Sequence, residues 1–203
     1  MKTVFLHGLG QTADAWDGVL AFLPGTDALC LSLYTLSEGA YSYSNLRQSV
    51  EEQMEKIPAP FCLCGLSLGA VLALEYSVRH PEKTASLVLI APQTDPPVWL
   101  MRLQMLLFRC MPEKAFGSMG LTKKDCIRLM GDMADLHLSR YVPQISCPTL
   151  VLCGEKDTAN RKAAEQIAAG ISGGKLQILP GAGHECNREA PEALADAIRT
   201  YIL

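Results

Sequence analysis

The stretch that decides the fold is Pro60-Phe61-Cys62-Leu63-Cys64-Gly65-Leu66-Ser67-Leu68-Gly69. Its first five residues form an apolar run typical of a buried strand, and its last five form the pattern G-x-S-x-G. The residues that follow, from Ala70 to His80, have the pattern of a buried helix. A serine between a strand and a helix, flanked by glycines where backbone segments pass closely, is the arrangement of a nucleophile elbow. The sequence therefore predicts that Ser67 lies at the tip of a sharp turn; a helix N-cap serine is the simpler alternative.

Short apolar runs and helical patterns alternate on both sides of this stretch. The runs that indicate strands cover residues 3–6, 28–32, 60–64, 86–90, 149–153 and 176–179. Helical patterns cover residues 12–22, 44–56, 68–80, 161–169 and 191–201. Repeated strand–helix units favour an α/β fold with a mostly or wholly parallel sheet of about six strands and helices on both faces. The whole chain, residues 1–203, is expected to form a single domain.

One interval interrupts this alternation. Between Pro92 and Pro148 no strand is expected, and residues 98–108 form an apolar helical run, followed by a second helical stretch at 123–138. We interpret residues 93–145 as a small helical cap inserted over the edge of the sheet where loops frame the elbow. The alternative is that these helices only complete the core.

An acid and a base follow two later strands. Asp157 comes after the strand at 149–153, and His184 comes after the strand at 176–179. The carboxyl ends of parallel strands lie at one edge of a sheet, so Ser67, Asp157 and His184 are expected to meet there. A serine needs such a base, and the base needs an orienting acid. Backbone N–H groups of Leu9, after the first strand, and Leu68, after the serine, are expected to form an oxyanion hole.

Composition limits the class of protein. The chain has 203 residues, 49% of them hydrophobic, and a formal net charge of −3. This composition gives no basic footprint for nucleic acid and no polybasic patch for anionic lipid. No apolar run approaches the roughly 20 residues that a membrane-spanning helix needs. The eight cysteines lack zinc or redox spacing and lie mostly in apolar runs. We therefore expect a reduced, cytoplasmic protein without a membrane span or bound metal.

These motifs together resemble the α/β-hydrolase superfamily over nearly the whole chain. The resemblance rests on His7-Gly8 after the first strand, the Gly65–Gly69 elbow, the stretch from Pro148 to Asp157, and Gly183-His184 before a final amphipathic helix. It implies a serine hydrolase that needs no cofactor. It also implies that His7 shapes the oxyanion loop, and that Asp95 is the rival of Asp157 as acid. Family members usually begin with a two-strand hairpin, which is absent before His7, so a trimmed, all-parallel, six-stranded sheet is expected.

The predicted reaction is hydrolysis of a carboxylic ester of a small or medium, partly hydrophobic substrate through an acyl-enzyme intermediate. Trp99, Leu103 and Leu107 on the apolar helical run are expected to contact the substrate. One alternative is a lyase or C–C bond-cleaving member acting on an anionic metabolite, with Arg102 and Arg109 over the site. Another is a non-catalytic ligand-binding member. A homodimer through the apolar helix stays open.

Overall fold

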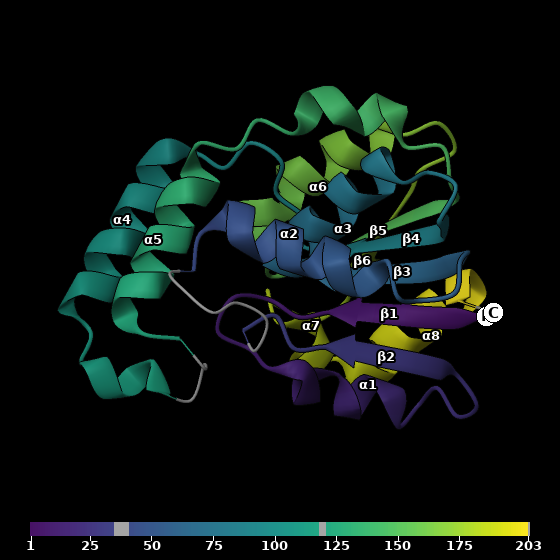
Figure 1. Cartoon of the computed structure of the whole chain (residues 1–203), viewed down its shortest axis with the longest axis horizontal. Helices are drawn as coiled ribbons and strands as arrows, with labels where there is room; N and C mark the ends of the chain where they lie inside the picture. The colour runs from purple at the N-terminus through teal and green to yellow at the C-terminus, as the bar shows by residue number, and fades with distance from the viewer. Residues whose placement is uncertain (35–40, 118–120, 203) are drawn as a thin grey trace.

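The computed structural model describes residues 1–34, 41–117 and 121–202. Within these residues, six parallel strands form one sheet in the order β2-β1-β3-β4-β5-β6, which confirms the predicted sheet (Figure 1). The strands are β1 (Lys2–Leu6), β2 (Asp27–Leu31), β3 (Phe61–Leu66), β4 (Thr84–Ile90), β5 (Thr149–Gly154) and β6 (Lys175–Leu179). The reversal of strand order at β1, with β2 on one side and β3 on the other, leaves a crevice where the loops after β1 and β3 diverge.

Helices cover both faces of this sheet (Figure 1). One face carries α1 (Asp17–Leu20), α7 (Cys186–Glu189) and α8 (Pro191–Ile202). The other carries α2 (Tyr43–Met54), α3 (Leu68–Arg79) and α6 (Thr158–Gly170). The helix predicted at 12–22 is instead a 3-10 turn, η1 (Ala13–Trp16), followed by α1.

The core consists of two apolar layers, one on each face of the sheet. In β1, Val4 and Leu6 pack into the layer beneath α2, α3 and α6, while Phe5 packs with Trp16 and α8 on the opposite side. This alternation follows from the two-residue period of a strand. Because both faces are covered, the central strands are mostly apolar, and every residue of β3 is buried.

The segment between β4 and β5 extends beyond the carboxyl ends of the strands (Figure 1). It contains α4 (Val98–Cys110), η2 (Glu113–Ala115), α5 (Lys123–Ala134) and η4 (Ser139–Gln144). Residues 118–120 of the predicted 93–145 insertion lie outside the described residues. The helix predicted at 123–138 ends at Ala134. A full capping box begins α5, because the side chains and backbone of Thr122 and Asp125 bond reciprocally.

Glycine makes the elbow between β3 and α3 sterically feasible. A Cβ atom on Gly65 would overlap the carbonyl of Gly69, and one on Gly69 would overlap the carbonyl of Leu6 in β1. Ser67 between them adopts φ 53° and ψ −113°, a region that non-glycine residues rarely occupy. Its N–H donates to the Ile90 carbonyl at the end of β4 (2.9 Å), which fixes the turn against the neighbouring strand.

We therefore expect Gly65→Ala to lower the free energy of unfolding by about 1–3 kcal/mol, since the added methyl group meets rigid backbone. Gly117→Ala is the matched control, because a Cβ there meets no atom of the described residues within 4 Å. Urea denaturation of both variants measures the difference. Equal stability of the two variants would contradict the tight contact at the elbow.

Candidate active site

Three side chains from distant parts of the sequence form one hydrogen-bonded chain at the carboxyl edge of the sheet. The Ser67 hydroxyl lies 3.1 Å from His184 Nε2. On the other side of the ring, His184 Nδ1 lies 2.8 Å from Asp157 Oδ2. In this arrangement Nδ1–H donates to the carboxylate, which leaves Nε2 free to accept the serine proton. The structure thus brings together the three residues that the sequence singled out.

The strand ends place these residues. Ser67 follows β3, Asp157 lies between β5 and α6, and His184 lies between β6 and α7. The loop that carries His184 lies directly against the end of β5, where a Cβ on Gly154 would overlap the carbonyl of Gly183. Glycine at the end of β5 therefore allows the base to approach the acid.

Asp157 is held in a defined orientation within the fold. Its side chain is only 4% exposed, and both carboxylate oxygens accept from Asn160 Nδ2, at 2.9 and 3.0 Å. Asp157 is also the N-cap of α6 through the Asn160 backbone N–H. Burial by itself raises the pKa of this carboxyl. Hydrogen bonds from His184 and Asn160 and the charge of His184 outweigh burial, so its pKa lies below the usual value.

His184 has the opposite pKa shift. Its hydrogen bond to Asp157 raises the pKa of the imidazole above the ordinary value, against the lowering effect of burial, and the carboxylates of Glu185 and Glu189 add to the rise. Glu189 also fixes the loop around the ring. Its carboxylate accepts from the N–H of Gly183 at 2.8 Å and from that of Glu185 at 3.0 Å, one residue on either side of His184.

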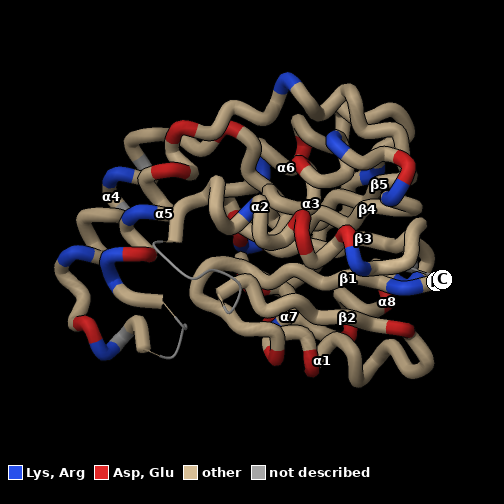
Figure 2. The backbone as a smooth tube through the Cα atoms, in the orientation of Figure 1, with Lys and Arg blue, Asp and Glu red and all other residues tan. Residues whose placement is uncertain are grey.

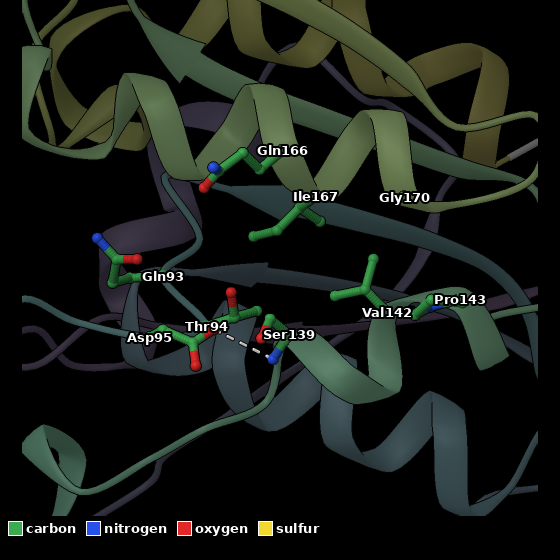
Figure 3. Close-up of a pocket in the computed structure, with 9 residues that line it drawn as sticks. All are labelled: Gln93, Thr94, Asp95, Ser139, Val142, Pro143, Gln166, Ile167 and Gly170. Carbon is green, nitrogen blue, oxygen red and sulfur yellow. Dashed lines mark hydrogen bonds between the residues drawn. The ribbon is translucent and has the colours of Figure 1, made fainter.

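Asp95, the rival acid, lies in a different cluster. Its carboxylate accepts from Ser139 N–H at 3.2 Å and lies 3.3 Å from His137 Nδ1. It lines a cavity of about 410 Å³ between α6 and η4 that Figure 3 shows, together with Thr94 and Gln166. In this structure the carboxylate that contacts His184 is therefore that of Asp157. Glu155, nearer its strand, accepts from Gly181 N–H instead.

The two predicted oxyanion donors both lie near the serine. Leu68 is the first residue of α3, and Leu9 lines the cavity at Ser67. Among the described residues, neither backbone N–H donates to a protein acceptor. The loop before Leu9 packs close to the serine, since a Cβ on Gly8 would lie 3.6 Å from Ser67 Cβ. Two free amides beside a serine hydroxyl can bind a developing oxyanion.

Buried polar contacts hold this loop. His7 Nε2 accepts from Leu33 N–H at 3.1 Å and Nδ1 lies 2.9 Å from the Gly8 carbonyl, so both ring nitrogens have backbone partners. Burial lowers the pKa of His7. The side-chain amides of Gln11 and Asn187 pair reciprocally at 3.1 and 3.2 Å and are almost fully buried. Because Asn187 lies in α7, this pair joins the Leu9 loop to the His184 loop.

A cavity of about 130 Å³ opens at Ser67. Its walls come from the sheet edge and from the interval between β4 and β5. The sheet edge and α6 contribute Leu9, Ser67, Ala159, Asn160 and His184, and the interval contributes Gln93, Pro96, Pro97, Met101, Met130 and Met133. It shares Gln93 with the larger cavity of Figure 3.

The structure places the three predicted substrate-binding residues elsewhere. Trp99, Leu103 and Leu107 are not among the residues that line the Ser67 cavity, and all three are exposed. They lie on the outer side of α4, whereas Met101 on the inner side packs with Met130 of α5. An apolar run fixes neither which side of a helix faces the protein nor which residues reach a cavity, so the sequence did not distinguish the outer side of this helix from the side that lines the cavity.

Other site residues had weaker signals in the sequence. Asn160 and Glu189 act on Asp157 and the His184 loop through hydrogen bonds, and the Gln11–Asn187 pair joins segments 176 residues apart. An Asn three residues after an N-cap Asp can be recognised in the sequence as a helix-capping pattern. The Gln11–Asn187 pair depends on tertiary contact and has no such signal. In the described part of the chain, no group of three or more His, Cys, Asp or Glu side chains is arranged to hold a metal ion.

Comparison with known proteins establishes the family. The model of the alpha/beta hydrolase family matches residues 3–197, and the chain therefore belongs to this family. Mouse monoacylglycerol lipase ABHD6 is 23% identical over an alignment that covers 98% of this chain and 74% of that protein. Pimeloyl-[acyl-carrier protein] methyl ester esterase of Aromatoleum aromaticum is 34% identical, but over only 43% of this chain and 35% of its own.

Solved structures support the same fold. The enol-lactonase from Burkholderia xenovorans superposes with a TM-score of 0.85 at 17% identity, covering 98% of this chain and 90% of its own. A thermophilic esterase from Thermogutta terrifontis gives a TM-score of 0.81 at 19% identity, covering 99% and 89%. At these identities the similarity establishes the architecture and not the reaction.

We expect the pKa of His184 to lie above the ordinary histidine value of about 6.5 and to fall in Asp157→Asn. The carboxylate stabilises the imidazolium, and without its charge the lowering effect of burial dominates. Asn keeps an acceptor for the N-cap of α6, so the fold is preserved. NMR titration of the imidazole resonances measures both values. An unchanged pKa in Asp157→Asn would contradict the coupling.

Proposed function

We propose that this protein is a serine hydrolase that cleaves carboxylic esters, with Ser67 as nucleophile, His184 as general base and Asp157 as the orienting acid. The observation that carries the proposal is the continuous hydrogen-bonded chain from Ser67 Oγ through both ring nitrogens to Asp157, at 3.1 and 2.8 Å. The left-handed φ of Ser67 supports it, because backbone strain of this kind is typical of functional positions.

The proposed reaction has two halves. Ser67 Oγ attacks the acyl carbon while its proton passes to His184 Nε2, and the resulting oxyanion accepts from the N–H groups of Leu9 and Leu68. The C–O bond to the alcohol then breaks, and the alcohol leaves with the proton from Nε2. In the second half, water gives its proton to His184 and attacks the acyl-serine. Collapse of this intermediate releases the acid and restores the Ser67 hydroxyl.

The lining of the Ser67 cavity favours a neutral, partly apolar substrate. Met101, Met130 and Met133 supply an apolar wall, and methionine side chains adapt to acyl groups of irregular shape. None of the described lining residues is Lys or Arg. The lyase alternative required cationic groups over the site, and Arg102 and Arg109 are exposed residues of α4 that do not line this cavity. The relatives by sequence named above, a monoacylglycerol lipase and a methyl ester esterase, are by name enzymes that act on esters, in agreement with the proposal.

The central test is Ser67→Ala. We expect hydrolysis of p-nitrophenyl butyrate to fall by roughly 10⁴ or more, because removal of a triad nucleophile has this effect in serine hydrolases. A fluorophosphonate probe should label the wild type and leave Ser67→Ala unlabelled. Labelling should also be lost in His184→Ala, which keeps the serine but removes its base.

Two outcomes would reject the proposal. A residual rate above about a tenth of wild type in Ser67→Ala would exclude this serine as the nucleophile. A wild-type protein that is folded but neither labelled nor active on any ester of a chain-length panel would favour the ligand-binding alternative. Ser77→Ala is a suitable control, because the hydroxyl of this buried serine donates to the Leu74 carbonyl within α3.

The methionine wall predicts chain-length selectivity. We expect Met130→Ala to move the preferred p-nitrophenyl ester to a longer acyl chain, since truncation enlarges a cavity of only about 130 Å³ at Ser67. Met105→Ala is the control variant. It makes the same substitution on α4, at a methionine that packs toward Gly131 and is not among the residues that line the cavity. Ratios of kcat/KM across the panel provide the measurement. The same shift in both variants would mean that the cavity wall does not select the acyl group.

A further inference from the structure

The outer side of α4 is an apolar stripe with unusually high exposure. Trp99, Leu103, Leu106 and Leu107 are 69%, 47%, 56% and 57% exposed, respectively. Spacings of three and four residues place these four side chains on one side of the helix, opposite Met101 and Phe108, which pack toward α5. Isolated exposed leucines are ordinary, but a contiguous group that includes a tryptophan marks an interaction surface. We call these four residues the α4 stripe.

The inserted segment that carries the α4 stripe is rich in basic side chains. The segment 98–134 has six basic residues: Arg102, Arg109, Lys114, Lys123, Lys124 and Arg128. It has only three acidic ones, so it is positive within a chain whose formal net charge is −3. Figure 2 shows Lys and Arg gathered along α4 and α5. Composition averaged over the whole chain concealed this local excess.

Several of these positive charges are available for a partner. Arg102 and Arg109 are seven residues apart and share one flank of the stripe. Both are exposed, as are Lys124 and Arg128 of α5. Within the described part of the chain, none of these four forms a salt bridge. Lys123 differs, because its ammonium group donates to the carbonyls of Arg109 and Met111 at the end of α4.

We propose that the α4 stripe and its basic flank dock the protein on an anionic lipid surface. Leucine and tryptophan side chains with arginines beside them are the composition of a helix that lies in a membrane interface. Basic residues near such a surface add electrostatic attraction to its anionic headgroups. A second copy of this chain fits less well, because a symmetric contact through the stripe would bring Arg102 and Arg109 of both copies together.

Docking of this kind is peripheral and reversible. In the described residues no helix is both long and apolar enough to cross a membrane. The stripe also lies close to the Ser67 cavity, because Met101 of the same helix lines it. Docking would therefore bring the cavity near the lipid surface. The proposal does not depend on ester hydrolysis, since it rests on exposure and charge alone.

The two tryptophans provide a direct assay. Trp16 is fully buried in the core, so Trp99 is the tryptophan that can report on insertion. Vesicles of phosphatidylcholine with about one third phosphatidylglycerol should bind the protein, shift its emission to the blue and allow quenching by brominated acyl chains. Phosphatidylcholine alone should bind it at least roughly tenfold more weakly. In Trp99→Phe the blue shift and the quenching should disappear while sedimentation with anionic vesicles persists.

Surface variants test the electrostatic part and the apolar part of the proposal separately. Arg102→Glu with Arg109→Glu, and separately Leu103→Asp with Leu107→Asp, should each lower the partition coefficient on anionic vesicles at least roughly tenfold. Lys56→Glu with Lys175→Glu makes the same charge change at exposed sites near the amino ends of β3 and β6 and should have little effect. Circular dichroism confirms that each variant is folded.

Three results would overturn the proposal. One is the absence of binding to anionic vesicles, and another is an equal loss of binding in the control pair. The third is a lipid-free dimer in analytical ultracentrifugation that Leu103→Asp with Leu107→Asp dissociates, which would assign the α4 stripe to a second copy. Because none of these measurements uses ester turnover, failure here leaves the proposed hydrolase activity to be judged separately.

Discussion

The structure depends on the close backbone contact between β1, β3 and the start of α3. Gly65 and Gly69 bring the carbonyls of Gly69 and Leu6 into positions that a Cβ atom would occupy. This contact forces the chain to turn at Ser67 with a positive φ and lifts the residue out of the sheet. The strain is stabilised by burial on all sides, since β3 and most of α3 lie in the core. A serine placed in this way is held in one position relative to the carboxyl ends of the other strands.

The remaining site residues are held against that fixed point by polar contacts within the fold. Asn160 orients Asp157, Glu189 holds the backbone on both sides of His184, and the Gln11–Asn187 pair joins the His184 loop to the Leu9 loop. Buried polar groups are costly unless they are paired, so each of these contacts favours one loop conformation over its alternatives. The geometry of the three central residues is therefore a property of the surrounding network as much as of the strands.

The interval between β4 and β5 has a different physical character from this rigid edge. Its inner surface presents methionines to the Ser67 cavity, and the opposite side of the same helix presents the α4 stripe. Methionine side chains adapt to shape, while the sheet edge fixes the reacting groups. If the protein acts as we propose, the fold separates chemistry, which requires precise positions, from selectivity and surface contact, which depend on the inserted helices.

The sequence by itself determined the sheet, the elbow, its serine and histidine, and two candidate acids, Asp157 and Asp95. These features are encoded locally: apolar runs of strand length, a G-x-S-x-G pattern, and an acid and a histidine each placed just after a strand. Parallel topology then brings Ser67, Asp157 and His184 to one edge without further information. Only the tertiary structure decided that Asp157 and not Asp95 contacts His184, that Met101 and not Trp99 lines the cavity, and that Gln11 pairs with Asn187. The physical reason is that these choices depend on side-chain direction and on contacts between segments far apart in the chain, which a linear pattern does not contain.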